Sequence, residues 1–185
     1  MKIGILVGSL RKNSWNKKLA KEVASLIKEE TYFIDLADMP FYNQDLDLEE
    51  VHPAYTRLRE DVKACDAFIF VTPEYNRSLA PVLKNAIDIA SRGPEGNLWN
   101  GKPAAVFSST IGSMGGVSSN LALKQSFACV GLIAMAQPEV YLSKINELMD
   151  KEGKLIPATR DFVQTACDSF VDFAGKIIGL SLIHI

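Results

Sequence analysis

The chain has 185 residues, of which 48% are hydrophobic and 23% charged, so it is long enough to bury a full core within one domain of ordinary size. Its formal net charge of −2 excludes a general electrostatic attraction to nucleic acid or to an anionic membrane surface. Any anion site must therefore be local, which favours a small-molecule ligand.

The sequence predicts a cytoplasmic protein without a membrane anchor. The apolar run after Met1 is too short for a secretory leader, and no later stretch reaches the roughly 18 uninterrupted apolar residues of a membrane span. The three cysteines have no metal-ligand spacing and are interpreted as buried apolar thiols. The only histidines, His52 and His184, lie in a loop and beside the last residue, so a Ser/His/Asp site is not expected.

Strand-like and helix-like patterns alternate along the chain. Short apolar runs rich in β-branched and aromatic residues predict strands buried on both faces, at residues 3–7, 32–36, 67–72, 104–108 and 133–137. Apolar stripes at helical spacing lie between them, clearest within residues 19–27 and 83–90. Pro81 suits the start of the third helix, Gly131 the end of the fourth, and Pro157 the start of a last helix reaching about Gly179.

This alternation predicts an α/β fold with helices on both faces of a doubly wound parallel sheet. Five strands favour the flavodoxin-like order 2-1-3-4-5. A single domain is expected over residues 1–180, with residues 181–185 as a C-terminal tail. In this topology the loops after strands 1, 3 and 4 converge at the carboxyl edge of the sheet, where such folds bind FMN.

The loop after the first strand has the composition of a cradle for one phosphate. Ser9, Ser14 and Asn16 offer hydrogen bonds, Arg11 offers a planar cation, and the following helix adds its N-terminal dipole. The plainer alternative is that Ser14 only caps the helix and that Arg11 is a solvated charge. Dinucleotide G-x-G-x-x-G and Walker patterns are missing here, which disfavours a dehydrogenase or a nucleotidase.

The loops after the third and fourth strands complete the predicted site. In the first of these, Pro73 and the polar residues after it form a loop whose backbone suits a flat heterocycle, while Tyr75 supplies aromatic surface. The other, at residues 109–116, carries three glycines that allow close backbone approach to a ligand, although a plain turn explains them equally well. Together the loops suggest a flavin site.

Two motifs resemble the NAD(P)H-dependent FMN reductases, whose relatives include quinone, chromate and azo-dye reductases. The motifs are Gly8-Ser9-Leu10-Arg11 with Ser14 and Asn16, and Pro73-Glu74-Tyr75-Asn76 followed by Leu83-Lys84-Asn85-Ala86-Ile87-Asp88. The resemblance extends from Met1 to about Gly179. It implies noncovalent FMN whose phosphate is held by Ser9, Arg11, Ser14 and Asn16. The resemblance further implies that the flavin ring is bordered by Pro73, Glu74, Tyr75, Asn76 and Ser78. The loop that closes the site would include Ser109, Gly112 and Gly115.

The resemblance also implies a homodimer, with a tetramer as the alternative. Chromate-reducing relatives carry Arg and Tyr in the helix after the glycines, where this chain has Ser118 and Leu121. Chromate reduction and tetramer assembly are therefore not implied by these residues.

The predicted activity is hydride transfer from NADPH or NADH through FMN to a quinone or a similar small acceptor, in a ping-pong sequence. No acid or base side chain is needed, because the cofactor carries the reaction and the protein orients it. One alternative is a flavodoxin-type electron carrier, but the phosphate loop and the acidic docking face of such carriers are not matched here. Another is a flavin-storing module without turnover, since fold does not determine function.

Overall fold

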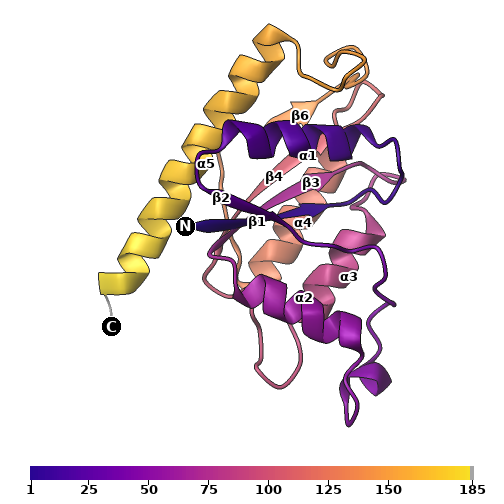
Figure 1. Ribbon diagram of the computed structural model, residues 1–185, viewed down its shortest axis with the longest axis vertical. Coiled ribbons are helices and arrows are strands. Elements are labelled where there is room, and N and C mark those ends of the chain that lie inside the picture. Colours follow the sequence, from indigo (N-terminus) through magenta and orange to yellow (C-terminus); the bar gives the residue numbers. More distant parts are fainter. Residues whose placement is uncertain (184–185) are drawn as a thin grey trace.

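The computed structural model describes residues 1–183 and has three layers, with helices on both faces of one parallel sheet (Figure 1). The elements in chain order are β1 (Lys2–Val7), α1 (Trp15–Leu26), β2 (Glu30–Phe33), the 3-10 helix η1 (Gln44–Asp47), α2 (Pro53–Lys63), β3 (Ala67–Thr72), α3 (Pro81–Ala90), β4 (Pro103–Ser109), α4 (Val117–Val130), β5 (Ile133–Ala134), β6 (Val140–Leu142) and α5 (Pro157–Ile183).

The strand order β2-β1-β3-β4-β5 confirms the predicted doubly wound, flavodoxin-like topology, and the short strand β6 also pairs with β4. All pairs are parallel, with Ile5 opposite Ile69 and Ile69 opposite Ala105. Every residue of β3 and β4 is buried, as expected for strands covered on both faces.

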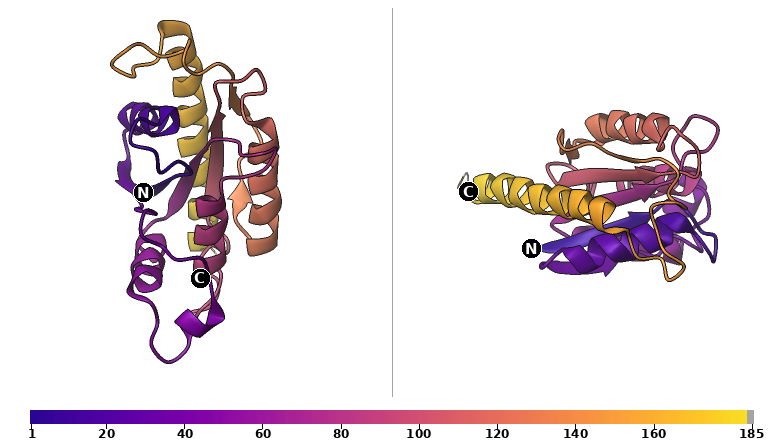
Figure 2. Two further views of the ribbon diagram at one scale, coloured as in Figure 1. Left: turned by 90° about the vertical axis from the view of Figure 1, so that its right-hand side faces the viewer. Right: turned by 90° about the horizontal axis from the view of Figure 1, so that it is seen from above.

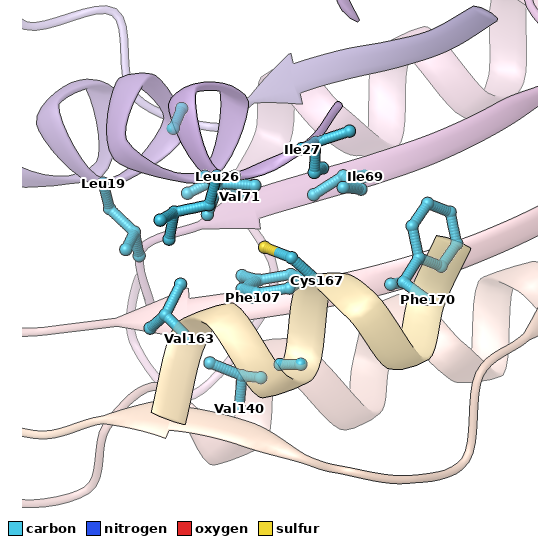
Figure 3. Packing of buried hydrophobic residues seen from close by; sticks show 14 of the residues in the cluster. Leu19, Leu26, Ile27, Ile69, Val71, Phe107, Val140, Val163, Cys167 and Phe170 are labelled. Atoms are coloured by element: carbon cyan, nitrogen blue, oxygen red, sulfur yellow. The ribbon is translucent and has the colours of Figure 1, made fainter. Parts of the chain in front are cut away.

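Two hydrophobic clusters hold the helices against the sheet. On one face, α1 and α5 pack over the strands through apolar side chains that include Leu19, Val71, Phe107 and Phe170 (Figure 3). On the other face, α2, α3 and α4 cover the sheet around the fully buried Trp99. Figure 2 shows α5 running diagonally across its face and projecting beyond the sheet.

Two predicted strand boundaries are wrong. β2 was expected at residues 32–36 but ends at Phe33, because Ile34 and Leu36 turn into the core beyond the last strand pairing. The fifth strand, expected over residues 133–137, consists of two residues, and pairing with β4 resumes only at Val140. The segment between them contains Pro138, which has no N–H to donate.

The last helix does not end near Gly179 but continues to Ile183. Part of the predicted tail is therefore helical, and its residues 184 and 185 lie outside the described residues. The helix punctuation was otherwise predicted correctly, since Pro81 begins α3 and Gly131 ends α4 in the left-handed conformation, with φ of 71°. Within residues 1–183, no helix has the length and apolar character needed to cross a membrane.

Candidate functional site

The loops after β1, β3 and β4 meet at the carboxyl edge of the sheet and are tied to one another. Gly8 N donates to Val71 O at 2.8 Å, and a Cβ on Gly8 would lie 2.8 Å from a methyl of Leu83 and 2.9 Å from the Cβ of Ala80. Glycine is therefore required for the first loop to pack against α3.

The first and third loops are joined by Asn16 and Ser109. Asn16 Nδ2 donates to the carbonyl oxygen of Ser109 at 3.2 Å, and Ser109 Oγ donates to Asn16 Oδ1 at 3.1 Å. Both side chains are buried. These two predicted site residues therefore bond each other and hold two loops together.

The first loop leaves donors available for an anion. Ser14 is the N-cap of α1, because its Oγ accepts a hydrogen bond from Lys17 N at 3.3 Å. The N–H groups of Trp15 and Asn16 stand in the first turn of α1 and bond no other residue within 1–183. Ser9 is buried beside them, whereas Arg11 is exposed and forms no ion pair with another described residue. A helix start with unbonded donors and a nearby guanidinium suits a phosphate.

The second loop contains a tight turn with an unusual backbone. Tyr75 and Ser78 exchange two backbone hydrogen bonds, at 3.1 and 2.9 Å. The two residues between them, Asn76 and Arg77, have φ of 50° and 64°, a conformation that is costly for residues other than glycine. Their N–H groups bond no residue in the described part of the chain, so they remain available to a ligand.

Glu74 ties this second loop to α4. Its Oε2 accepts hydrogen bonds from Ser118 N at 2.9 Å and Ser119 N at 3.3 Å. The N-cap residue of α4 is Gly116, which has no side chain to accept them. The Glu74 carboxylate therefore caps α4 from another loop, and its side chain is only 10% exposed.

Two glycines of the third loop are required by its geometry. Gly115 has φ of 59°, and a Cβ there would lie 2.8 Å from the carbonyl carbon of Tyr141, while Gly116 has φ of 79°. Gly112 is not left-handed, and a Cβ on it would meet only Thr110 Oγ1, at 3.9 Å. Burial, followed by hydrogen bonding to the Glu139 carboxylate, raises the pKa of Tyr141 to about 12.

A cavity of about 310 Å³ opens between the first loop, the second loop, α3 and the segment that follows β2. Among the predicted site residues, Arg11 and Tyr75 line it. The complete lining is Gly8, Leu10, Arg11, Leu36, Ala37, Met39, Phe41, Tyr75, Pro81, Val82 and Asn85. Apolar and aromatic walls with one guanidinium suit a flat ring that carries a few polar atoms.

The sequence interpretation missed a buried polar cluster beneath the start of α4. Thr72 Oγ1 and Ser119 Oγ lie 2.9 Å apart, and Asn120 Nδ2 donates to Val106 O at 3.2 Å. Asn120 Oδ1 is buried without a partner among the described residues. The only sequence signal was the hydroxyl residues at the ends of the apolar strands. Phe41 and Asn85 were missed as cavity residues as well.

The sequence is similar to those of known flavin-linked reductases. The sequence model of a family described as NADPH-dependent FMN reductase matches residues 1–147. A quinone reductase from Pseudomonas putida is 39% identical over 173 residues, which cover 92% of this chain and 93% of that protein. A 2-hydroxy-1,4-benzoquinone reductase from Burkholderia sp is 37% identical over 175 residues, 92% of this chain and 94% of that protein.

Solved structures show the same fold. FerB, a flavoenzyme NAD(P)H:(acceptor) oxidoreductase from Paracoccus denitrificans, superposes with a TM-score of 0.88 at 36% identity, over 95% of this chain and 97% of that one. A flavodoxin from Pseudomonas aeruginosa has a TM-score of 0.57 at 18% identity, over 92% of this chain and 99% of that one. The flavodoxin likeness concerns the fold alone.

Proposed function

Because the chain belongs to the family of NADPH-dependent FMN reductases, we propose that it transfers hydride from NAD(P)H through bound FMN to a quinone or a similar small acceptor. The observation that carries this proposal is the meeting of three loops that leave backbone donors unbonded, with an apolar cavity between the first two of them. Donor and acceptor use the same cavity in turn, so the oxidised coenzyme leaves before the acceptor enters.

The residues present fit FMN. When bound, FMN supplies the hydride and electron chemistry, so the protein needs no acid or base of its own. Arg11 and the first turn of α1 bind the phosphate, with Ser9 and Ser14 shaping that loop. The N–H groups of Asn76 and Arg77 are unbonded among the described residues, and they would donate to the polar edge of the ring.

The other predicted site residues act through the backbone and by holding the loops. Pro73, Glu74 and Ser78 keep the second loop in place beside the ring, and Tyr75 offers its aromatic face from the cavity wall. Ser109, Gly112 and Gly115 belong to the loop that closes the site, with Asn16 anchoring that loop to α1.

A homodimer through α4 is part of this proposal. The outward face of α4 exposes Leu121, Gln125, Ala128 and Cys129, and Leu121 is 52% exposed. A largely apolar exposed face with one amide is suited to covering by a second copy. A cytoplasmic location is also part of this proposal, and either NADPH or NADH serves as the hydride donor.

An anaerobic titration tests the proposed reaction. Protein reconstituted with FMN is mixed under argon with NADPH and, in parallel, with NADH, and the flavin absorption band is followed. We expect the band to bleach and to return when benzoquinone is added, faster than for free FMN at the same concentration. If the band persists with both coenzymes, the reductase proposal is wrong and the electron-carrier or storage alternative gains.

A further inference from the structure

The segment after β2 forms one wall of the cavity without belonging to a helix or a strand. Residues 39–43 have no regular structure, and Met39 and Phe41 line the cavity together with Tyr75. Phe41 is 75% exposed, the largest exposed fraction among the large apolar side chains of residues 1–179. Such exposure is costly for a phenyl ring unless a ligand or a partner covers it.

The backbone on both sides of Phe41 is held by two side chains from the neighbouring helices. Asn85 of α3 accepts from Tyr42 N at 2.7 Å through Oδ1 and donates to Pro40 O at 2.8 Å through Nδ2. Tyr55 of α2 donates its hydroxyl to Phe41 O at 2.7 Å and accepts from Asn43 N at 3.0 Å. Tyr55 is fully buried and Asn85 is 6% exposed, so these bonds are shielded from water.

Two arginines extend this support along the same segment. Arg57 donates to Asp35 O at 3.1 Å and pairs with Asp38, while Arg59 pairs with Asp47 and donates to Ile89 O. Hydrogen bonds from fixed helices thus replace the strand or helix bonds that the segment lacks. The exposed ring of Phe41 is therefore presented on a backbone that cannot easily move to bury it.

We propose that Phe41 is a specificity-determining residue that contacts flat ring acceptors of the quinone type, and that Tyr55 and Asn85 are positioning residues that act through it. This inference rests on the proposed function, because it concerns the acceptor step. The occupant is the acceptor ring, since Phe41 shares its cavity with Arg11 and Tyr75 of the predicted flavin site. Stacked or edge-on contact with Phe41 favours quinones over acceptors without a ring.

The acceptor step can be isolated from the donor step. Holoenzyme is reduced chemically with dithionite, so NAD(P)H is not needed, and its reoxidation by benzoquinone or by ferricyanide is followed by stopped flow. For Phe41→Ala we expect the rate constant with benzoquinone to fall about tenfold, equivalent to about 1.4 kcal/mol, and that with ferricyanide to change less than about twofold. Phe41→Tyr should restore the quinone rate.

Leu48→Ala is the matched control, because Leu48, directly after η1, is also exposed but does not line this cavity. It should leave both rates unchanged. Equal losses with both acceptors, or no loss with benzoquinone, would overturn the role of Phe41. Unchanged rates with a lower sedimentation coefficient would instead show that a second copy covers the ring. A failure of NAD(P)H to reduce the enzyme would count against the proposed function only.

The positioning role has its own test in a double-mutant cycle. Tyr55→Phe removes only the hydroxyl, and we expect it to slow the quinone step about threefold in the native background but not in Phe41→Ala. Amide exchange should accelerate at Asn43, whose N–H loses its acceptor. Additive effects in the two backgrounds would overturn positioning through Phe41. Asn85→Asp, which keeps the acceptor for Tyr42 N and loses the donor to Pro40 O, repeats the cycle if Tyr55→Phe does not fold.

Discussion

Asn16 and Ser109 exchange two hydrogen bonds, at 3.2 and 3.1 Å, across the carboxyl edge of the sheet. Both side chains are buried, and their bonds join the start of α1 to the end of β4. The first and third loops of the site are thus held in one arrangement before any ligand binds, which lowers the conformational cost of binding.

Replacing Asn16 should therefore affect the fold and both flavins alike. Asn16→Leu leaves buried groups of Ser109 without partners, so we expect the free energy of unfolding to fall by about 1–3 kcal/mol in urea titrations. FMN and riboflavin should be weakened by the same factor in fluorescence-quenching titrations. Asn13→Ala, an exposed position in the same loop, is the control. A selective loss of FMN affinity would mean that the side chain of Asn16 contacts the phosphate directly.

Arg11 should behave in the opposite way, because it is exposed and unpaired among the described residues. Arg11→Ala removes a charge-assisted contact with phosphate, so FMN binding should weaken by about 10- to 150-fold, or roughly 1.5–3 kcal/mol. Riboflavin lacks the phosphate and should bind nearly as before. Equal weakening of both ligands, or of neither, would contradict the placement of the phosphate at this loop.

Glu74 should contribute to stability through α4. Glu74→Ala leaves the N–H groups of Ser118 and Ser119 without an acceptor and removes a negative charge from the helix N-terminus. We expect a loss of about 1–2 kcal/mol in urea unfolding of the apoprotein. Glu74→Gln keeps an acceptor and should lose less. Equal losses for the two variants would argue against a capping role.

The convergence of the three loops could be predicted from the sequence, but the contacts between them could not. Carboxyl ends of parallel strands share one edge, so polar loops after three apolar runs had to converge there. By contrast, Asn16 and Ser109 are 93 residues apart, and Glu74 and Ser118 are 44 apart. Such pairs depend on the packing of the whole sheet, which no local pattern encodes. Ser14 caps α1, as expected in the alternative interpretation of the first loop.

The same limit explains why the wall formed by residues 39–43 was not predicted. The sequence interpretation followed loops that leave the sheet directly after β1, β3 and β4. The wall lies farther along the chain after β2, and side chains of α2 and α3 hold it there. Its polar anchors, Tyr55 and Asn85, lie within amphipathic helices, where periodicity marks them only as members of a buried face.

The outward face of α4 should control the oligomeric state. Leu121→Glu places a charge in the proposed dimer interface, so we expect sedimentation equilibrium to give the monomer mass for this variant and the dimer mass for the native protein. Phe162→Glu on α5, an exposed apolar residue of the opposite layer, is the control. An unchanged mass for Leu121→Glu would place the contact elsewhere.

The buried cysteines should make the protein less stable at alkaline pH. Burial raises the pKa of Cys65 to about 11 and that of Cys167 to about 12, whereas thiols in the unfolded chain ionise near their ordinary value. Above about pH 9 the unfolded state therefore binds fewer protons than the folded state, and stability falls as pH rises towards 11. Below pH 8 these thiols are protonated in both states and should add no pH dependence to the free energy of unfolding.

Melting temperatures measured between pH 8 and 10 test this effect. The quantity to compare between variants is the slope of melting temperature against pH, not the melting temperature itself. Cys65→Ala and Cys167→Ala each create a small cavity and lower the melting temperature at every pH, but each should flatten the alkaline slope. Cys129 is exposed, contrary to the expectation that all three thiols are buried, so Cys129→Ala should leave the slope as it is. If all three variants keep the native slope, the alkaline loss comes from groups other than these thiols.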